Sequence, residues 1–154
     1  MDEKDVYKRF DILSEPAVKL AKKGKRRQAI KFLEKIATEN DRQIYYLAQI
    51  DIGACLEGLG KDKEAIERYQ SIPESEFEFY IHAQFRLAEL LIRLRKMDEA
   101  QAIYDKLSSY TSLTPHMKNA LGCLLDRLNK MEEALQLFNS ITRSDGIEIY
   151  VAAK

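Results

Sequence analysis

Apolar residues recur along the chain at the spacing of amphipathic helices, and the same pattern is written four times. The stretches that share it are KRRQAIKFLEKI (25–36), GKDKEAIERYQSIP (60–73), KMDEAQAIYDKL (96–107) and KMEEALQLFNSI (130–141). Each holds an alanine in the same place, and successive alanines lie 36, 35 and 34 residues apart. A repeat of this length is typical of stacked helical hairpins. These reference alanines are Ala29, Ala65, Ala100 and Ala134.

Fixed distances from each reference alanine predict two helices per copy. Four and seven positions after it, apolar residues form one face of a second helix: Leu33, Ile36, Tyr69, Ile72, Tyr104, Leu107, Phe138 and Ile141. Thirteen, twelve and nine positions before it, a first helix carries three more: Pro16, Ala17 and Leu20, then Ile52, Gly53 and Leu56, then Leu87, Ala88 and Leu91, then Leu121, Gly122 and Leu125. Neither helix buries its face alone, so the copies should stack around one continuous core.

Turn and capping residues lie where these helices should begin and end. A left-handed residue should close each first helix, at Gly24, Gly60, Arg95 and Asn129; arginine adopts this conformation at some cost. Acidic residues crowd the first turn of the last three second helices, where the helix dipole favours them: Asp62, Glu64, Asp98, Glu99, Glu132 and Glu133. Ser75 with Glu78 predicts a capping box, and Thr114 with Pro115 predicts a cap followed by a proline at the first helical position.

The composition fits one soluble domain, residues 1–154. With 45% hydrophobic residues, the chain can bury a sizeable core. Lysine and arginine total 25, as do aspartate and glutamate, so no net charge draws the protein to nucleic acid or an anionic membrane. No stretch approaches the roughly 18 apolar residues that cross a bilayer, which predicts a cytoplasmic protein without membrane insertion. Cys55 and Cys123 fall in apolar helical patterns and are expected to be buried.

The last residues of the chain match the beginnings of two earlier first helices. QIYYLAQ (43–49), EFYIHAQ (78–84) and EIYVAAK (148–154) align, with Tyr45, Tyr80 and Tyr150 in register. We therefore expect a helical lead-in at 1–9, four repeats over 10–143, and the start of a fifth repeat or a terminal helix at 144–154. A stack that stops there leaves apolar surface in water. The chain is then a piece of a longer array, or its open C-terminal end is covered by another molecule, self-association included.

The repeated order of small residue, leucine, glycine, acid, glutamate, alanine and aromatic residue resembles the tetratricopeptide repeat (TPR), over about residues 10–143 and in all four copies. No copy has the family's tryptophan or closing proline, which leaves other helical-hairpin arrays open. The resemblance implies an all-α fold: a right-handed superhelical array of antiparallel helical hairpins, or TPR-like α-solenoid. It also implies a non-enzymatic protein interaction module or scaffold, whose first helices line a concave groove for a partner peptide or helix.

The resemblance also implies which residues face the groove. They form an apolar centre with a mixed-charge margin, so the apolar side chains would supply affinity and the charges register. The groove residues are Val18, Lys22, Leu47, Ile50, Ala54, Glu57, His82, Phe85, Arg86, Glu89, Ile92, Arg93, His116, Asn119, Cys123, Asp126 and Arg127. The alternative for Leu47, Ile50 and Phe85 is that they belong to the core.

Chaperone-binding members of the family hold a peptide's terminal carboxylate with basic and amide side chains. The matching places here hold Ser14, Val18 and Asp51, and only Arg86 fits. Because Asp51 would repel the carboxylate, no such clamp is expected.

Residues with catalytic or metal-binding chemistry are few. His82 and His116 stand in equivalent places, with Cys123 one heptad after His116; a metal or acid–base cluster is the alternative to ordinary groove histidines. No zinc-binding, phosphate-loop or nucleophile motif occurs, so we expect no cofactor, no metal and no enzymatic activity. The basic run KKGKRR (22–27) is interpreted as a solvated turn, with a contact to nucleic acid or an acidic partner as the alternative.

Two further functions stay open. An RNA-binding helical-repeat protein also uses hairpins of about 35 residues, although the balanced charge argues against it. Within the leading class, the chain could act as a chaperone, an assembly factor or a regulatory part of a larger TPR protein. The sequence does not identify the protein or peptide partner.

Overall fold

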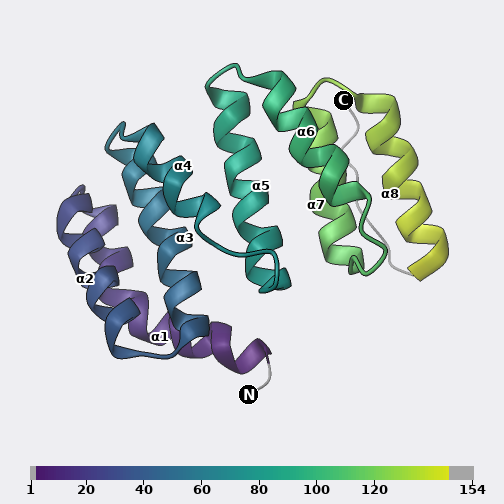
Figure 1. The fold of residues 1–154 in the computed structure, drawn as a ribbon. Helices are drawn as coiled ribbons and strands as arrows, with labels where there is room; N and C mark the ends of the chain where they lie inside the picture. Colours follow the sequence, from purple (N-terminus) through teal and green to yellow (C-terminus); the bar gives the residue numbers. More distant parts are fainter. Residues whose placement is uncertain (1–2, 146–154) are drawn as a thin grey trace. The chain divides into compact units, whose positions relative to one another are not determined.

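The fold is built from helices alone in the part of the chain that the computed structural model describes, residues 3–145, with side chains described for residues 5–141. The predicted all-α class is confirmed (Figure 1). The helices are α1 (Glu3–Lys22), α2 (Arg26–Glu39), α3 (Arg42–Gly58), α4 (Asp62–Gln70), α5 (Phe77–Arg93), α6 (Met97–Ser108), α7 (Pro115–Arg127) and α8 (Met131–Asp145). The handedness of the array remains a prediction, and most of the expected fifth-repeat segment, from residue 146 on, lies outside the described residues.

The chain divides into two compact units, Met1–Ala83 and Gln84–Lys154, with the boundary inside α5. In unit 1, α1 packs on α2, α2 on α3, and α3 on α4, with a further contact between α1 and α3. In unit 2, α7 packs on α8 and also contacts α6. The odd-numbered helices are thus the first helices of the repeats and the even-numbered ones the second helices. The single-domain prediction stays a prediction.

Four backbone turns of one geometry join the first helices to the second helices. Gly24, Gly60, Arg95 and Asn129 have φ of 78°, 75°, 65° and 64°, as the sequence predicted. After each, the N–H of a lysine donates to the carbonyl of a leucine five residues earlier, at 2.9, 2.9, 2.8 and 2.9 Å. These pairs are Lys25 with Leu20, Lys61 with Leu56, Lys96 with Leu91, and Lys130 with Leu125. This bonding pattern is the Schellman motif, which ends a helix at a left-handed residue.

The reference alanines are among the most deeply buried positions of both units: Ala29, Ala65, Ala100 and Ala134 are all 0% exposed. In unit 1, a Cβ on Gly53 would lie 2.5 Å from Cε1 of Tyr69, a side chain that is itself fully buried. In unit 2, a Cβ on Gly122 would overlap the ring of Phe138. Glycine at this place therefore lets the aromatic ring of the second helix rest directly on the backbone of the first helix.

Arg68 ties three helices of unit 1 together. Its guanidinium donates to Oε1 of Gln49 on α3 at 2.9 Å and to Oε1 of Glu34 on α2 at 3.4 Å. Gln49 is only 4% exposed, so its amide oxygen needs a partner inside the protein. At the start of the first helices, the ring of Phe79 lies 6.2 Å from that of Tyr7 and 6.1 Å from that of Tyr46.

The predicted helix ends are partly confirmed. The Thr114 hydroxyl accepts from the N–H of Met117 at 3.2 Å, and Pro115 is the first residue of α7, as expected. The acids predicted in the first turns of α4, α6 and α8 are there. The capping box at Ser75 is wrong, because the N–H of Glu76 donates to the carbonyl of Pro73 and α5 begins only at Phe77. An unpredicted cap occurs at Asp41, which accepts from the N–H of Ile44.

The prediction for one member of the apolar face is also wrong. Pro16 is exposed, whereas its counterpart Ile52 is 0% exposed. Ile52 belongs to α3, which packs against α2 of the preceding repeat. No helix precedes α1 among the described residues, so nothing covers the same side of α1 there.

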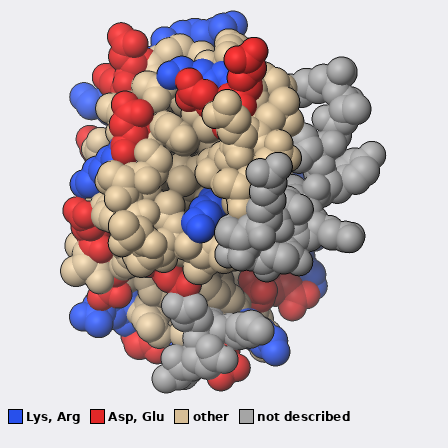
Figure 2. Space-filling model, turned by 90° about the vertical axis from the view of Figure 1, so that its right-hand side faces the viewer, with Lys and Arg blue, Asp and Glu red and all other residues tan. Residues whose placement is uncertain are grey.

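Charged side chains of both signs are interleaved on the surface. Figure 2 shows blue and red groups alternating along the margin of one face, with uncharged residues over much of its centre. Basic and acidic side chains are thus mixed on this face, and the whole sequence balances them with 25 of each sign.

Arg95→Gly is expected to raise the free energy of unfolding by about 0.5–1 kcal/mol. A left-handed conformation costs a residue with a Cβ roughly 1–2 kcal/mol, and glycine avoids this cost. The greater freedom of glycine in the unfolded chain offsets part of the resulting gain in stability. Urea unfolding measures the change. The reverse change, Gly60→Ala, should lower stability by about 1 kcal/mol, since a Cβ there meets nothing within 4 Å and only the backbone is strained. Equal stability of both variants and the parent would contradict this account of the turns.

Gly53→Ala is expected to destabilise the protein by about 1–3 kcal/mol, because the new Cβ overlaps a buried ring that has no room to move. The double variant Gly53→Ala with Tyr69→Leu copies the pair found in the first repeat, Ala17 and Leu33. It should recover part of the loss, so the two changes would be non-additive in a double-mutant cycle of thermal unfolding. Additive losses would show that this contact does not limit the packing of α3 on α4.

Candidate functional site

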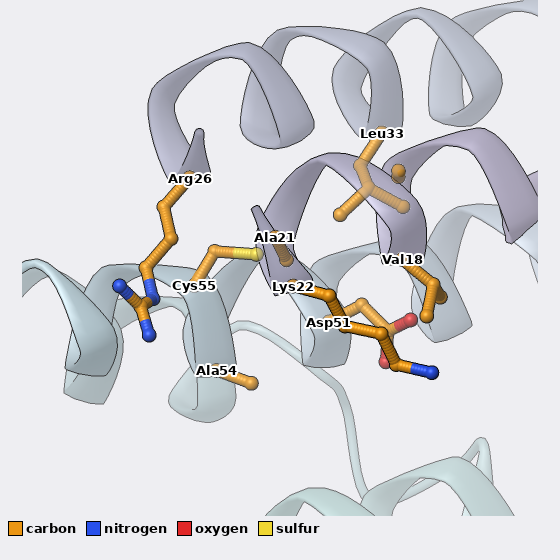
Figure 3. Close-up of a pocket in the computed structure, with 9 residues that line it drawn as sticks. Val18, Ala21, Lys22, Arg26, Leu33, Asp51, Ala54 and Cys55 are labelled. Atoms are coloured by element: carbon orange, nitrogen blue, oxygen red, sulfur yellow. The ribbon is translucent and has the colours of Figure 1, made fainter. Parts of the chain in front are cut away.

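The first helices of unit 1 border an open pocket of about 400 Å³. It lies between the last turns of α1 and the middle of α3, with the beginning of α2 closing it (Figure 3). The predicted groove residues Val18, Lys22 and Ala54 come together here, from two different repeats. The remaining lining residues are Ala17, Ala21, Arg26, Leu33, Asp51 and Cys55.

The pocket exists because its walls are made of small side chains. Alanines 17, 21 and 54 keep the facing sides of α1 and α3 short, and Leu33, 2% exposed, fills the space on the side of α2. Val18 is 42% exposed and presents an apolar group at the opening. A concave, mainly apolar site with a few polar groups is the usual form of a binding pocket in proteins.

Three charged side chains border the pocket: Lys22, Arg26 and Asp51. The side chain of Arg26 packs on α3 at Gly58, where a Cβ would lie 2.2 Å from its Nε. Figure 3 shows Arg26 on one side of Cys55, with Lys22 and Asp51 on the other side. The local charge therefore differs between the two ends of the pocket.

The thiol of Cys55 is half-buried in this wall, and Figure 3 shows its sulfur directed toward Ala21. Burial raises the pKa of Cys55; the negative charge of Asp51 raises it further, and the positive charge of Arg26 lowers it. The raised pKa favours the neutral thiol at neutral pH, so Cys55 contributes an apolar, uncharged surface to the pocket.

Other predicted groove residues of unit 1 do not reach this surface. Leu47 and Ile50 are 3% and 2% exposed and are core side chains, as the alternative reading held. Glu57 is half-buried and accepts a hydrogen bond from the hydroxyl of Tyr69, which fastens α3 to α4. His82 is exposed near the start of α5.

In unit 2, the predicted residues lie along α5 and α7. Oε2 of Glu89 and Nη1 of Arg127 form an ion pair at 3.7 Å, which joins the first helices of the third and fourth repeats. Phe85, Arg86, Ile92, Asn119 and Asp126 are half-buried, and Arg93 and His116 are exposed. The ion pair brings one predicted residue from each helix together.

The prediction that Cys123 is buried is wrong, because this thiol is exposed. It stands one residue after the buried Gly122, on the side of α7 that also carries His116 and Arg127. An apolar helical pattern alone does not show which side of the helix a small residue occupies. In residues 5–141, no three His, Cys, Asp or Glu side chains are grouped as a metal ion would require.

The sequence analysis missed most of the pocket wall. The sequence interpretation placed Arg26 in a solvated turn, with a contact to nucleic acid or an acidic partner as the alternative, and treated Asp51 as a residue that excludes a carboxylate clamp. The repeat phase carried a signal: Asp51 and Ala54 are three residues apart on one helix and face the same side. The approach of α1 to α3 that turns these residues into a pocket becomes visible only in three dimensions.

No helix among residues 3–145 is long and apolar enough to cross a membrane. Stacked antiparallel helix pairs joined by identical turns define a helical-hairpin repeat protein. The family model described as tetratricopeptide repeat matches residues 82–110, which cover most of α5, the turn at Arg95 and α6. No curated protein matches the chain.

The match to this family model supports the resemblance to the tetratricopeptide repeat that was predicted from the sequence, over residues 82–110. The number of copies remains a prediction. Tetratricopeptide repeats are generally non-enzymatic modules of protein–protein interaction.

The two thiols should differ in their reaction with iodoacetamide. Because Cys123 is exposed while Cys55 is half-buried with a raised pKa, Cys123 should be alkylated several-fold faster at pH 7.5. Only the thiolate reacts, so the rate at Cys55 should keep increasing with pH above the ordinary thiol pKa of about 8.5. Mass spectrometry of the digested protein measures both rates. Faster alkylation of Cys55 would contradict the pocket described here.

Proposed function

We propose that this protein is a non-catalytic interaction module that holds a peptide or helix of a partner protein on the exposed faces of its first helices. The observation that carries the proposal is the pocket between α1 and α3. Val18, Lys22 and Ala54, which the family resemblance assigns to the inward face, line one concave surface there. Pockets with apolar walls and a charged margin give affinity through the walls and orientation through the margin.

The binding surface comprises one part in each unit. In unit 1 it is the pocket. In unit 2 it is the α5–α7 face, with Phe85 and Ile92 as apolar groups and the pair of Glu89 with Arg127 as its charged border. Leu47 and Ile50 are left out of the proposed surface, since buried side chains do not reach a partner. Whether the two parts hold one segment or two is left to experiment.

The other functions raised by the sequence are weaker. An RNA-binding role would call for a broad basic face. The face in Figure 2 carries both signs of charge, and the one dense basic stretch of the sequence is the short run at residues 22–27. A place in the cytoplasm, service as a chaperone or assembly factor within a larger protein, and self-association through the C-terminal end remain predictions of the sequence.

Ala54→Phe should fill the pocket and remove peptide binding there by tenfold or more. The experiment selects binders from a random 12-residue peptide library against the whole chain and then measures each enriched peptide by fluorescence polarisation. Phe85→Ala tests the face of unit 2 in the same way, by removing its largest apolar group. Thr38→Phe is the matched control, because Thr38 is exposed on α2, a second helix.

Every enriched peptide should lose affinity for Ala54→Phe or for Phe85→Ala and keep it for Thr38→Phe. Circular dichroism melting checks that each variant folds. If no peptide is enriched, or if enriched peptides bind both groove variants as tightly as the parent, the first-helix faces are not binding surfaces.

A further inference from the structure

The basic run of the sequence forms one end of the pocket. KKGKRR spans the end of α1, the left-handed turn at Gly24 and the start of α2. Lys22 and Arg26 line the pocket itself, while Lys23, Lys25 and Arg27 are exposed beside it. Five positive charges in six residues thus surround the edge of an apolar cavity.

Little negative charge opposes them. Asp51 is the one acid that lines the pocket. Among the acids on the same three helices, Glu15 pairs with Lys19 at 3.2 Å, Glu34 pairs with Arg68 at 3.4 Å, and Glu57 accepts from the hydroxyl of Tyr69. The field at the pocket edge is therefore positive, most of all at the end formed by Arg26 and the turn, away from Asp51.

We propose that this pocket takes an aliphatic side chain from a partner segment whose neighbouring residues are acidic. The inference rests on the proposed function and adds the chemistry of the partner. None of the nine lining residues is aromatic, and the walls are alanine, valine, leucine and a neutral thiol. They offer an aliphatic side chain apolar contact and removal from water. Acidic neighbours of that side chain would then lie against the basic turn.

This mode differs from capture of a chain end. A terminal carboxylate seated in the pocket would be attracted by Lys22 and Arg26, but it would also meet the like charge of Asp51 and walls that are mainly apolar. An internal segment places its uncharged anchor there and its carboxylates outside, where Lys23, Lys25 and Arg27 remain hydrated and accessible. Charges at a binding margin act mainly on association rate and salt dependence.

Three pools of 11-residue peptides test the proposal, each randomised at its outer positions. The first has a central leucine between pairs of glutamate, the second replaces the glutamates by glutamine, and the third by lysine. Binding to the whole chain is measured by fluorescence polarisation at 50 and 300 mM salt. The acidic pool should bind roughly tenfold more tightly than the glutamine pool at low salt, and this advantage should shrink at high salt.

Alkylation of Cys55 reports where the peptides bind. A saturating concentration of the acidic pool should slow the reaction of Cys55 with iodoacetamide, because the central leucine of the peptide would cover the thiol in the pocket wall. The rate at the exposed Cys123, which lies in unit 2, should not change and serves as the internal control.

Charge variants should change the affinity for the acidic pool in opposite directions. Loss of folding could only lower that affinity, so it cannot explain an increase. Arg26→Gln should weaken the acidic pool roughly two- to fivefold, and Asp51→Asn should strengthen it by a similar factor. Gly58→Ala should weaken it as well without altering net charge, since the new Cβ displaces the Arg26 side chain. Lys35→Gln and Glu64→Gln, both at exposed positions of second helices, are the matched controls and should leave binding unchanged.

Equal or tighter binding of the glutamine or lysine pool would overturn the acidic preference. The proposed function would be unaffected by that result, because it is tested separately by the loss of affinity of library peptides for Ala54→Phe. Binding of the acidic pool without protection of Cys55 would overturn the pocket as its site. A single-stranded RNA 20-mer serves as the competing class, and protection of Cys55 by RNA that Arg26→Gln removes would replace the peptide proposal.

Discussion

A backbone hydrogen bond at the end of each first helix determines the path of the chain. In each turn the N–H of a lysine reaches back to a leucine carbonyl, and this bond closes only when the residue before the lysine has positive φ. The chain then reverses, and four residues after the lysine it delivers an alanine that is completely buried against the first helix. Because the turn is identical in the four places, the apolar faces on either side of it meet in the same register in each hairpin.

Within that register, one pair of residues determines how closely the two helices approach. Where the first helix offers Gly53, the ring of Tyr69 is 0% exposed; where it offers Ala88, the corresponding ring of Tyr104 is only half-buried. Burial and the charges of Glu133 and Asp105 raise the pKa of Tyr104, which keeps its hydroxyl neutral. The repeats therefore differ in how deeply this ring is buried while they share one hairpin geometry. The first repeat, with Ala17 and Leu33 at these places, uses the space differently and leaves a pocket beside them.

Periodicity predicted the fold well because each repeat has the same apolar positions and the same positive-φ turn at the same spacing. Four positive-φ positions, including the unfavourable Arg95, were predicted from the alignment of copies alone. Predictions that rested on one copy were weaker: the cap at Ser75 failed because Pro73 forms a turn with Glu76, and Pro16 is exposed because nothing packs on its side of α1 within the described residues. The site was predicted only in part. Val18, Lys22 and Ala54 were expected in the groove because of the family resemblance, whereas Arg26, Cys55 and Leu33 join them through the approach of neighbouring helices, which no single stretch of sequence encodes.

The bridge made by Arg68 bears on how such an array evolves and how it can be cut. The guanidinium belongs to the second repeat, yet Glu34, one of its two acceptors, belongs to the first, and Gln49, the other acceptor, is buried. A truncation after the first hairpin, or a transplant of the second hairpin into another scaffold, would separate Arg68 from Glu34 and loosen the one cation that satisfies the Gln49 side chain. The first two hairpins are therefore linked by a side-chain bridge as well as by the packing of α2 on α3, and a cut between them would break both.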